Sequence, residues 1–177
     1  IAAGSATTVA RRDDGSVVAW GWDSNDGEIL DVPALPAGLT YGEIAAGAGH
    51  TGARRSDGSV GAWGLDYFGQ LGVPALPAGL TYVEVAAGFA HTVARRSDGT
   101  VAAWGFNRQG QCIVPAFPIG VICVESKAGG DHIGSHTVLR LSDGSVVAFG
   151  FNTSGQCNVP ALPVGLSYVE IAAGGEH

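Results

Sequence analysis

The sequence lacks several features that mark large classes of proteins. Methionine is absent, lysine occurs once at Lys127, and only 14% of the 177 residues are charged. This low charge, beside 46% hydrophobic residues, excludes a charge-rich disordered chain, which buries too little apolar surface to fold. No apolar run approaches the roughly 18 residues of a transmembrane helix, so we expect no membrane insertion. The formal net charge of −7 argues against a nucleic-acid partner, whose phosphates need Lys and Arg.

Signals for processing and for catalysis are missing as well. No basic and apolar leader opens the chain, and a start at Ile1 suggests a processed or partial chain. No stretch keeps the i, i+3, i+4, i+7 apolar spacing of a helix, so we expect none. We find no nucleophile elbow, no paired catalytic carboxylates and no phosphate-binding loop that opens a helix. We therefore expect neither an enzyme nor a cofactor.

Glycine is abundant instead, and it marks an internal repeat. There are 29 glycines, and they show no three-residue period, which excludes collagen. The phrase Ile-Ala-Ala-Gly or a near copy starts at Ile1, Ile44, Val85 and Ile171, with a diverged copy at Ser126. These phrases divide the chain into repeats 1–43, 44–84, 85–125 and 126–170, with the start of a next repeat at 171–177. The glycines therefore punctuate a tandem repeat.

Each repeat predicts one blade of four short antiparallel strands. In the third repeat the expected segments are 85–87, 91–96, 101–105 and 111–114. Asp98-Gly99 favours a tight hairpin between the second and third of them, because such a turn needs a positive φ. Pro115 and Pro118 cannot donate to a ladder and are expected in the connection to the next repeat. Four short strands in about 40 residues, repeated, predict an all-β propeller whose blades stack on their neighbours.

The repeats also carry a motif that resembles a known family. His91-Thr-Val-Ala-Arg-Arg-Ser-Asp-Gly-Thr-Val-Ala-Ala-Trp-Gly105 is followed by Asn107 and Gly110-Gln111, and the pattern recurs at His50–Gly64 and His136–Gly150. It resembles the repeat of the regulator of chromosome condensation superfamily over essentially the whole chain. The short period and the Gln-Cys-x-Val-Pro endings are closer to short-repeat propellers, including secreted β-lactamase inhibitors.

The resemblance implies a fold more than a function. Family propellers usually have seven blades, so we expect four blades and the start of a fifth to be part of a larger ring. Secretion is slightly favoured by the resemblance, although the residues themselves set no compartment. Guanine-nucleotide exchange, enzyme inhibition and light sensing occur in the family, and none carries over residue by residue. Two positions depart from the pattern, Thr7 where the other repeats have His, and Phe149 where they have Trp.

Several side chains could ligate a metal or bind a ligand, but their recurrence in successive repeats favours a structural role. The recurring His50, His91 and His136 are expected to make a blade-level hydrogen bond to a neighbouring backbone group. Asp131 and His132 beside His136 could ligate a metal, but a longer contact loop is favoured. A Cys112–Cys123 disulfide is conceivable. The Arg pairs before the Asp-Gly turns could form a nucleic-acid stripe, which the acidic total opposes.

Strand direction predicts where a partner would bind. The loops between first and second strands and between third and fourth strands share one face, here called the variable-loop face. The Asp-Gly turns and the Pro-Ala-Leu-Pro type connections share the opposite, uniform face, here called the hairpin face. Rigid aromatics rimmed by polar groups are typical of protein interfaces. The candidate contact residues are Trp22, Asp23, Asp66, Tyr67, Phe68, Phe89, Arg108, Asp131 and His132.

These observations predict a non-catalytic protein-interaction scaffold or structural subunit. One alternative is a carbohydrate-binding propeller, in which Trp22 and Tyr67 stack on sugars. A second is a proteinaceous enzyme inhibitor. A third is an enzyme, which would need a convergent polar cluster at the ring centre. Self-association through open blade edges is a further possibility, and we expect a protein partner or larger assembly.

Overall fold

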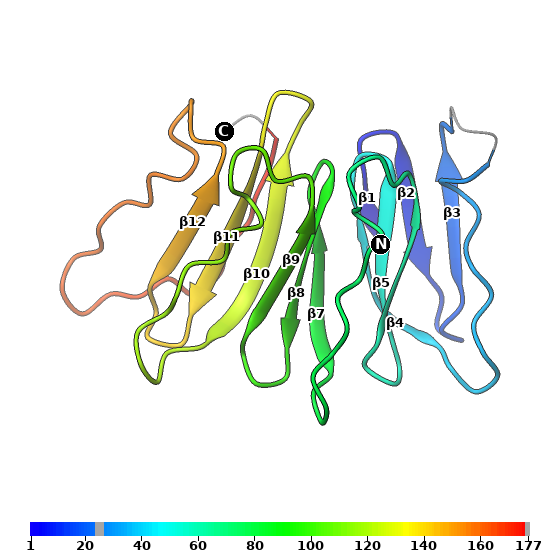
Figure 1. Ribbon diagram of the computed structural model, residues 1–177, viewed down its shortest axis with the longest axis horizontal. Helices are drawn as coiled ribbons and strands as arrows, with labels where there is room; N and C mark the ends of the chain where they lie inside the picture. Colours follow the sequence, from blue (N-terminus) through cyan, green and yellow to red (C-terminus); the bar gives the residue numbers. More distant parts are fainter. Residues whose placement is uncertain (24–26, 176–177) are drawn as a thin grey trace.

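The computed structural model describes residues 1–23 and 27–175, and the regular structure of these ranges is entirely β (Figure 1). It consists of four antiparallel sheets of three strands each. The strands are β1 (Ala2–Ala3), β2 (Thr7–Arg11) and β3 (Val17–Gly21); β4 (Tyr41–Ala46), β5 (His50–Arg55) and β6 (Val60–Gly64); β7 (Tyr82–Ala87), β8 (His91–Arg96) and β9 (Val101–Gly105); and β10 (Cys123–Gly130), β11 (Ser135–Leu141) and β12 (Val146–Gly150). No helix that could span a membrane occurs in the described ranges. The all-β class is confirmed.

The predicted hairpins form as the Asp-Gly turns indicate. In the third blade Gly99 adopts a φ of +80°, and the N–H of Arg96 donates to the carbonyl of Thr100 at 2.8 Å. The Asp98 carboxylate accepts the N–H and the hydroxyl of Thr100 at 2.9 and 2.7 Å. Equivalent glycines with positive φ turn the other three hairpins. The turn residues therefore set the pairing of the second and third strands.

The expected fourth strand is wrong, because the segment after each third strand forms no ladder in the described residues. The N–H groups of Val73, Val114 and Val159 bond to carbonyls only two residues back, at 2.8, 3.2 and 3.0 Å. A proline, which has no N–H, follows each of these valines. Two successive positions thus have no donor for pairing. The segment instead packs its apolar side chains on the blade, as Val73 and Leu76 do in the second repeat.

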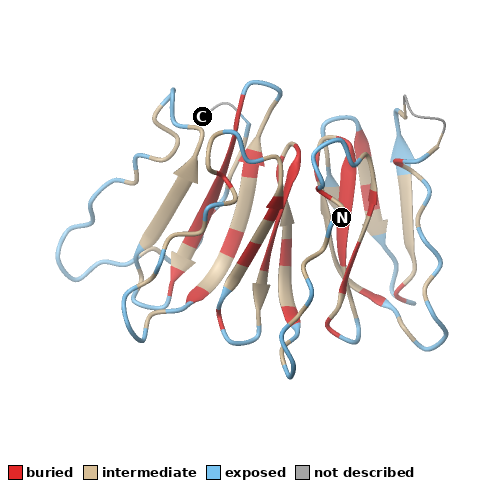
Figure 2. Ribbon diagram, viewed as in Figure 1, coloured by how far each residue is buried: buried red, intermediate tan, exposed pale blue. Residues whose placement is uncertain are grey.

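The sheets stand side by side, and the inner strand of each blade contacts the first two strands of the blade before it: β4 contacts β1 and β2, β7 contacts β4 and β5, and β10 contacts β7 and β8. The core lies between blades (Figure 2). One cluster joins Val9 of the first blade to Tyr41, Ala53 and Trp63 of the second. The next joins Val60 to Tyr82 and Trp104, and the third joins Val93 to Leu139 and Leu141. Each blade is therefore stabilised by its neighbours, as expected of a propeller. The repeat boundaries drawn from the sequence stay a prediction.

A buried polar chain crosses two of the blade seams. His50 Nε2 lies 3.0 Å from the hydroxyl of Thr92 in the next blade, and this hydroxyl donates to the carbonyl of Gln70 at 3.2 Å. Since the hydroxyl has one proton to give, His50 must donate through Nε2. His91 repeats the arrangement with Thr137 of the following blade, also at 3.0 Å. The prediction of a backbone partner is therefore wrong, because the imidazole bonds to a threonine side chain of the next blade.

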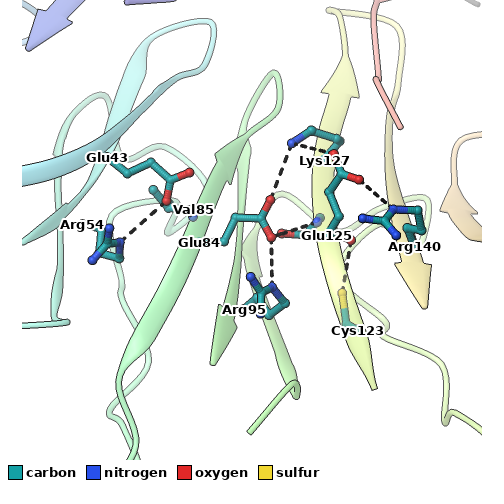
Figure 3. A network of polar contacts seen from close by, with 10 residues as sticks. Glu43, Arg54, Glu84, Val85, Arg95, Cys123, Glu125, Lys127 and Arg140 are labelled. Atoms are coloured by element: carbon teal, nitrogen blue, oxygen red, sulfur yellow. Dashed lines mark hydrogen bonds and ion pairs between the residues drawn. The ribbon is translucent and has the colours of Figure 1, made fainter. Parts of the chain in front are cut away.

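Charged residues on the inner strands form a second link between blades (Figure 3). The Glu84 carboxylate pairs with Arg95 at 3.1 Å in its own blade. It also accepts the N–H of Ser126 at 3.0 Å in the next blade and lies 3.5 Å from Lys127. A carboxylate placed between a cation and a neighbouring backbone donor fixes the spacing of two blades. This rigid stack supports the loops at its ends.

Candidate interaction face

Backbone hydrogen bonds hold the two kinds of loop together on the variable-loop face. The N–H of Trp22, which follows β3, donates to the carbonyl of Ala6 at 2.9 Å. The N–H of Leu65 donates to Gly49 at 2.7 Å in the second blade. The third and fourth blades repeat the bond. The loops that strand direction assigns to one face therefore lie together, and each blade fixes its own pair.

Aromatic side chains from three successive blades line one groove on this face. Trp22, Tyr67 and Phe68 are 66%, 71% and 50% exposed, and Phe89 is half-buried. Besides these aromatic rings, Ile29 and Leu65 supply the large apolar side chains of the groove lining. Phe68 also packs edge-on against Phe106, with ring centroids 4.8 Å apart. Four of the candidate residues, Trp22, Tyr67, Phe68 and Phe89, are thus brought together.

Two of the acidic candidates shape the groove walls. The Asp66 carboxylate accepts the N–H of Leu71 at 2.9 Å. Asp23 accepts the N–H groups of Ile29 and Leu30 at 3.0 and 3.2 Å. Hydrogen bonds from backbone donors to a carboxylate are strong, so they hold Ile29, Leu30 and Leu71 beside these two carboxylates.

Three contributors to this groove, Ile29, Leu65 and Gln70, are not among the contact residues predicted from the sequence. Ile29 and Leu65 were overlooked because each looks like an ordinary apolar residue of a strand or turn. Gln70 is buried, and its side-chain oxygen accepts the N–H of Phe68 at 2.9 Å. Its recurrence as a Gly-Gln pair in three repeats was the available signal. A glutamine kept at one place in a loop is typical of a side chain that satisfies backbone donors.

The remaining candidates do not line the groove. Arg108 is exposed on the loop after β9. The Asp131 carboxylate accepts the N–H groups of Ile133 and Gly134 at 2.7 and 3.0 Å, which shapes its own loop, and His132 is exposed. The described residues contain no group of three or more potential ligands that could hold a metal. The structure therefore separates these three positions from the aromatic cluster.

Small residues line the hollow between the inner strands, where an enzyme would need its polar cluster. The lining consists of Ala3, Gly4, Ser5, Ala46, Gly47, Ala48, Ala87, Gly88, Phe89, Ala128, Gly129, Gly130, Ala173 and Gly174. No titratable side chain is among these residues.

The three cysteines are free, so the conceivable Cys112–Cys123 disulfide is absent. Burial raises the pKa of Cys112 to about 11, which keeps its thiol protonated at neutral pH.

Radial sheets, cores at the blade seams and a small-residue centre define a β-propeller segment. Within that class, residues 1–28 and 82–111 match the model of the regulator of chromosome condensation (RCC1) repeat family. These two ranges carry RCC1-like repeats, as the sequence motif predicted, and the solved structures below share the propeller fold. The narrower similarity to β-lactamase inhibitor propellers stays a prediction. No curated protein matches the chain.

Solved propellers of several eukaryotes share this fold. Prp20p from Saccharomyces cerevisiae is 24% identical with a TM-score of 0.73, and the match covers 98% of this chain and 52% of Prp20p. Human WBSCR16 is 17% identical with a TM-score of 0.73, covering 98% and 55%. The ectodomain of the Arabidopsis thaliana receptor kinase ACR4 is 24% identical with a TM-score of 0.72, covering 98% and 64%. Identities this low establish the fold alone.

The chain spans less than two thirds of each of these structures. The number of blades in a complete ring of this protein stays a prediction.

Proposed function

We propose that this propeller segment is a protein-interaction module and that the aromatic groove is its contact site. The observation that carries the proposal is the convergence of Trp22, Tyr67 and Phe68 on one groove while they remain at least half exposed. Large aromatic side chains are enriched among the residues that dominate binding energy at protein interfaces. The bonds that Asp23, Asp66 and Gln70 accept hold Ile29, Leu71 and Phe68 in place before a partner binds, which lowers the cost of association.

Proteins of the same fold support this proposal by analogy. Prp20p binds Gsp1p and histones, and a structure of yeast Prp20 was determined with Kap60 bound. That structure is 21% identical to this chain with a TM-score of 0.70. The fold is thus used for protein contacts in other chains. The groove residues, and not this analogy, assign the contact site here.

A carbohydrate-binding propeller is the second candidate, because Trp22 and Tyr67 present exposed rings. Sugar sites combine such rings with polar groups that accept and donate hydrogen bonds to hydroxyls. Among the described lining residues the polar groups are the side chains of Ser5, Gln70 and Tyr67 and the indole N–H of Trp22, and the oxygen of Gln70 already accepts the N–H of Phe68. The apolar character of the groove therefore favours a polypeptide. An enzyme inhibitor would be one form of the proposed module.

The experiment compares the full chain with two matched double variants. Trp22→Ser with Tyr67→Ser removes two exposed groove side chains. Ile119→Ser with Val164→Ser removes two fully exposed apolar side chains from the hairpin-face connections. Each purified protein is used to select from a random twelve-residue peptide library displayed on phage and is applied to a glycan array.

We expect the chain and the hairpin-face variant to enrich the same peptides and the groove variant to lose them. Circular dichroism should show the same melting temperature for all three proteins, since the replaced side chains are exposed. Peptides retained equally by the groove variant would contradict the assignment of the site. Glycan binding that depends on Trp22 and Tyr67, without peptide enrichment, would favour the carbohydrate candidate.

A further inference from the structure

Acidic residues flank the residues that line the apolar groove. The segments 22–23, 27–31 and 65–71, which supply most of its large lining side chains, contain no Lys or Arg. Of their described acidic residues, Glu28, Asp31 and Asp66 are exposed and Asp23 is half-buried. The groove thus combines an apolar lining with a rim of one charge sign.

The charge is distributed unequally between the two faces. On the hairpin face acidic residues are interleaved with arginines, as in Arg12–Asp14, Arg55–Asp57 and Arg96–Asp98. On the variable-loop face the described acidic residues are Asp23, Glu28, Asp31, Asp66 and Asp131, and Arg108 is the one basic residue among the described loops. Arg108 belongs to the loop after β9, outside the groove lining. The negative excess of the chain is therefore concentrated around the candidate site.

We propose that the groove binds a basic segment of a partner protein, one that inserts a large apolar side chain between flanking Lys or Arg residues. This inference rests on the proposed function and names its partner class. The apolar side chain would be buried against Trp22, Ile29 and Leu65, which lie in the groove walls. The flanking cations would lie near Glu28 and Asp66 on the rim.

The expected energetics follow from the exposure of these groups. Burial of an apolar side chain the size of Leu or Phe supplies most of the affinity. A cation over the exposed face of Trp22 or Tyr67 gains further attraction from the ring. Exposed rim charges act over roughly 8 Å at physiological ionic strength, so they mainly affect association rate and salt dependence. Binding should consequently weaken as salt is added.

The test starts from the peptides that the phage selection enriches. We expect them to share at least one large apolar residue flanked by Lys or Arg, with a net positive charge. The tightest peptide is synthesised and titrated against the full chain at low and high NaCl concentration, with the fluorescence of the chain as the signal. We expect its affinity to fall about tenfold between the two salt concentrations.

Two double variants separate the rim charge from the total charge. Glu28→Gln with Asp66→Asn removes two rim charges and keeps the oxygen that accepts the N–H of Leu71. Asp13→Asn with Glu170→Gln removes two exposed charges outside the groove lining. The rim variant should bind the peptide about fivefold more weakly and lose part of the salt dependence, whereas the second variant should bind within twofold of the parent chain.

Each alternative outcome overturns a defined part of the argument. Groove-dependent peptides that are neutral or acidic, or a rim variant that binds normally, would overturn the basic partner and leave the interaction module standing. Absence of any groove-dependent peptide would overturn both. If the chain sediments as a dimer and the groove variant as a monomer, a second copy of the chain occupies the groove, and the basic partner is overturned. Glycan binding that depends on the groove would overturn a polypeptide partner of any kind.

Discussion

Replacing Thr7 with histidine should stabilise the seam between the first and second blades. Thr7 is buried at the position that His50 and His91 occupy in the following blades. Those histidines donate to threonine hydroxyls across their seams, whereas the hydroxyl of Thr51 in the second blade has no hydrogen-bond partner among the described residues. Thr51 is only 1% exposed, so water does not compensate for the missing bond. Thr7→His should supply it.

The first repeat has the glycine that a seam imidazole requires. A side chain at Gly47 or Gly88 would clash with the imidazole of His50 or His91, so glycine is needed beside each of these histidines. The first repeat already has Gly4 at the equivalent position. A net hydrogen bond contributes about 1 kcal/mol, and satisfying a buried hydroxyl adds a similar amount. We expect a gain of about 1–2 kcal/mol in the unfolding free energy, or roughly 3–6 °C in the melting temperature.

The assay is urea unfolding at pH 7.5, followed by circular dichroism, together with hydrogen exchange of the β2 amides. Blades can unfold separately, so the exchange measurement reports the first blade by itself. The same substitution is also made in a Thr51→Val background, which removes the acceptor. The double variant should show no gain over Thr51→Val. A gain of equal size in that background would refute the reasoning. Unchanged exchange of the β2 amides in the Thr7→His variant would refute it as well.

Three further predictions follow from contacts at the other seams. Gly88→Ala should lower the free energy of unfolding by about 2–3 kcal/mol, because the added Cβ would clash with the imidazole of His91. Chemical denaturation measures this loss. Glu84→Ala should cost about 2 kcal/mol by the same method, since the side chain is 13% exposed and its removal leaves Arg95 without its partner. Acid should destabilise the protein, because burial lowers the pKa of His50 to about 4 and of His91 to about 3, below the 6.5 of an unfolded chain. The unfolded state therefore binds more protons below pH 6.5, and stability should fall by about 2 kcal/mol per histidine by pH 5 in a pH series of unfolding curves.

Each of these predictions has a control within the chain. Gly175→Ala places its Cβ in open space and should change stability little. Glu43→Ala should cost less than Glu84→Ala, because Glu43 is more exposed and lies 3.8 Å from Arg54. His50→Gln should reduce the slope of stability against pH between 6.5 and 4. Equal losses in the paired variants, or an unchanged slope, would contradict the seam contacts described above.

Local pattern was sufficient to predict the strands that pair within a blade. The turn at Ser97-Asp98-Gly99 places β8 and β9 in register, since the bond from the Arg96 N–H to the Thr100 carbonyl closes a three-residue loop whose Gly99 has a positive φ. The fourth strand failed because its pairing depends on free N–H groups. The backbone amide of Val114 bonds within its own turn, and Pro115 has none to offer. Composition and periodicity contain no information about that competition.

The candidate site could be predicted as a face and not as a groove. Alternation of strand direction places Trp22 and Tyr67 at the same end of their blades, whatever the distance between the blades. Their convergence with Ile29 depends on how closely the blades pack and on the carboxylate of Asp23, which accepts the N–H of Ile29. The same unpredicted packing leaves Arg108 and His132 outside.

The sequence by itself determined the repeat, the hairpins and the all-β propeller class, because these depend on contacts between residues close in the chain. Only the tertiary structure decided which atoms meet across a seam. The partner of His50 lies forty-two residues away at Thr92, and the acceptor of the Ser126 amide is Glu84 of the preceding blade. Contacts of this kind are set by the rotation and spacing of whole blades, which result from the packing of all the seams together. The aromatic groove and its acidic rim are consequences of that packing.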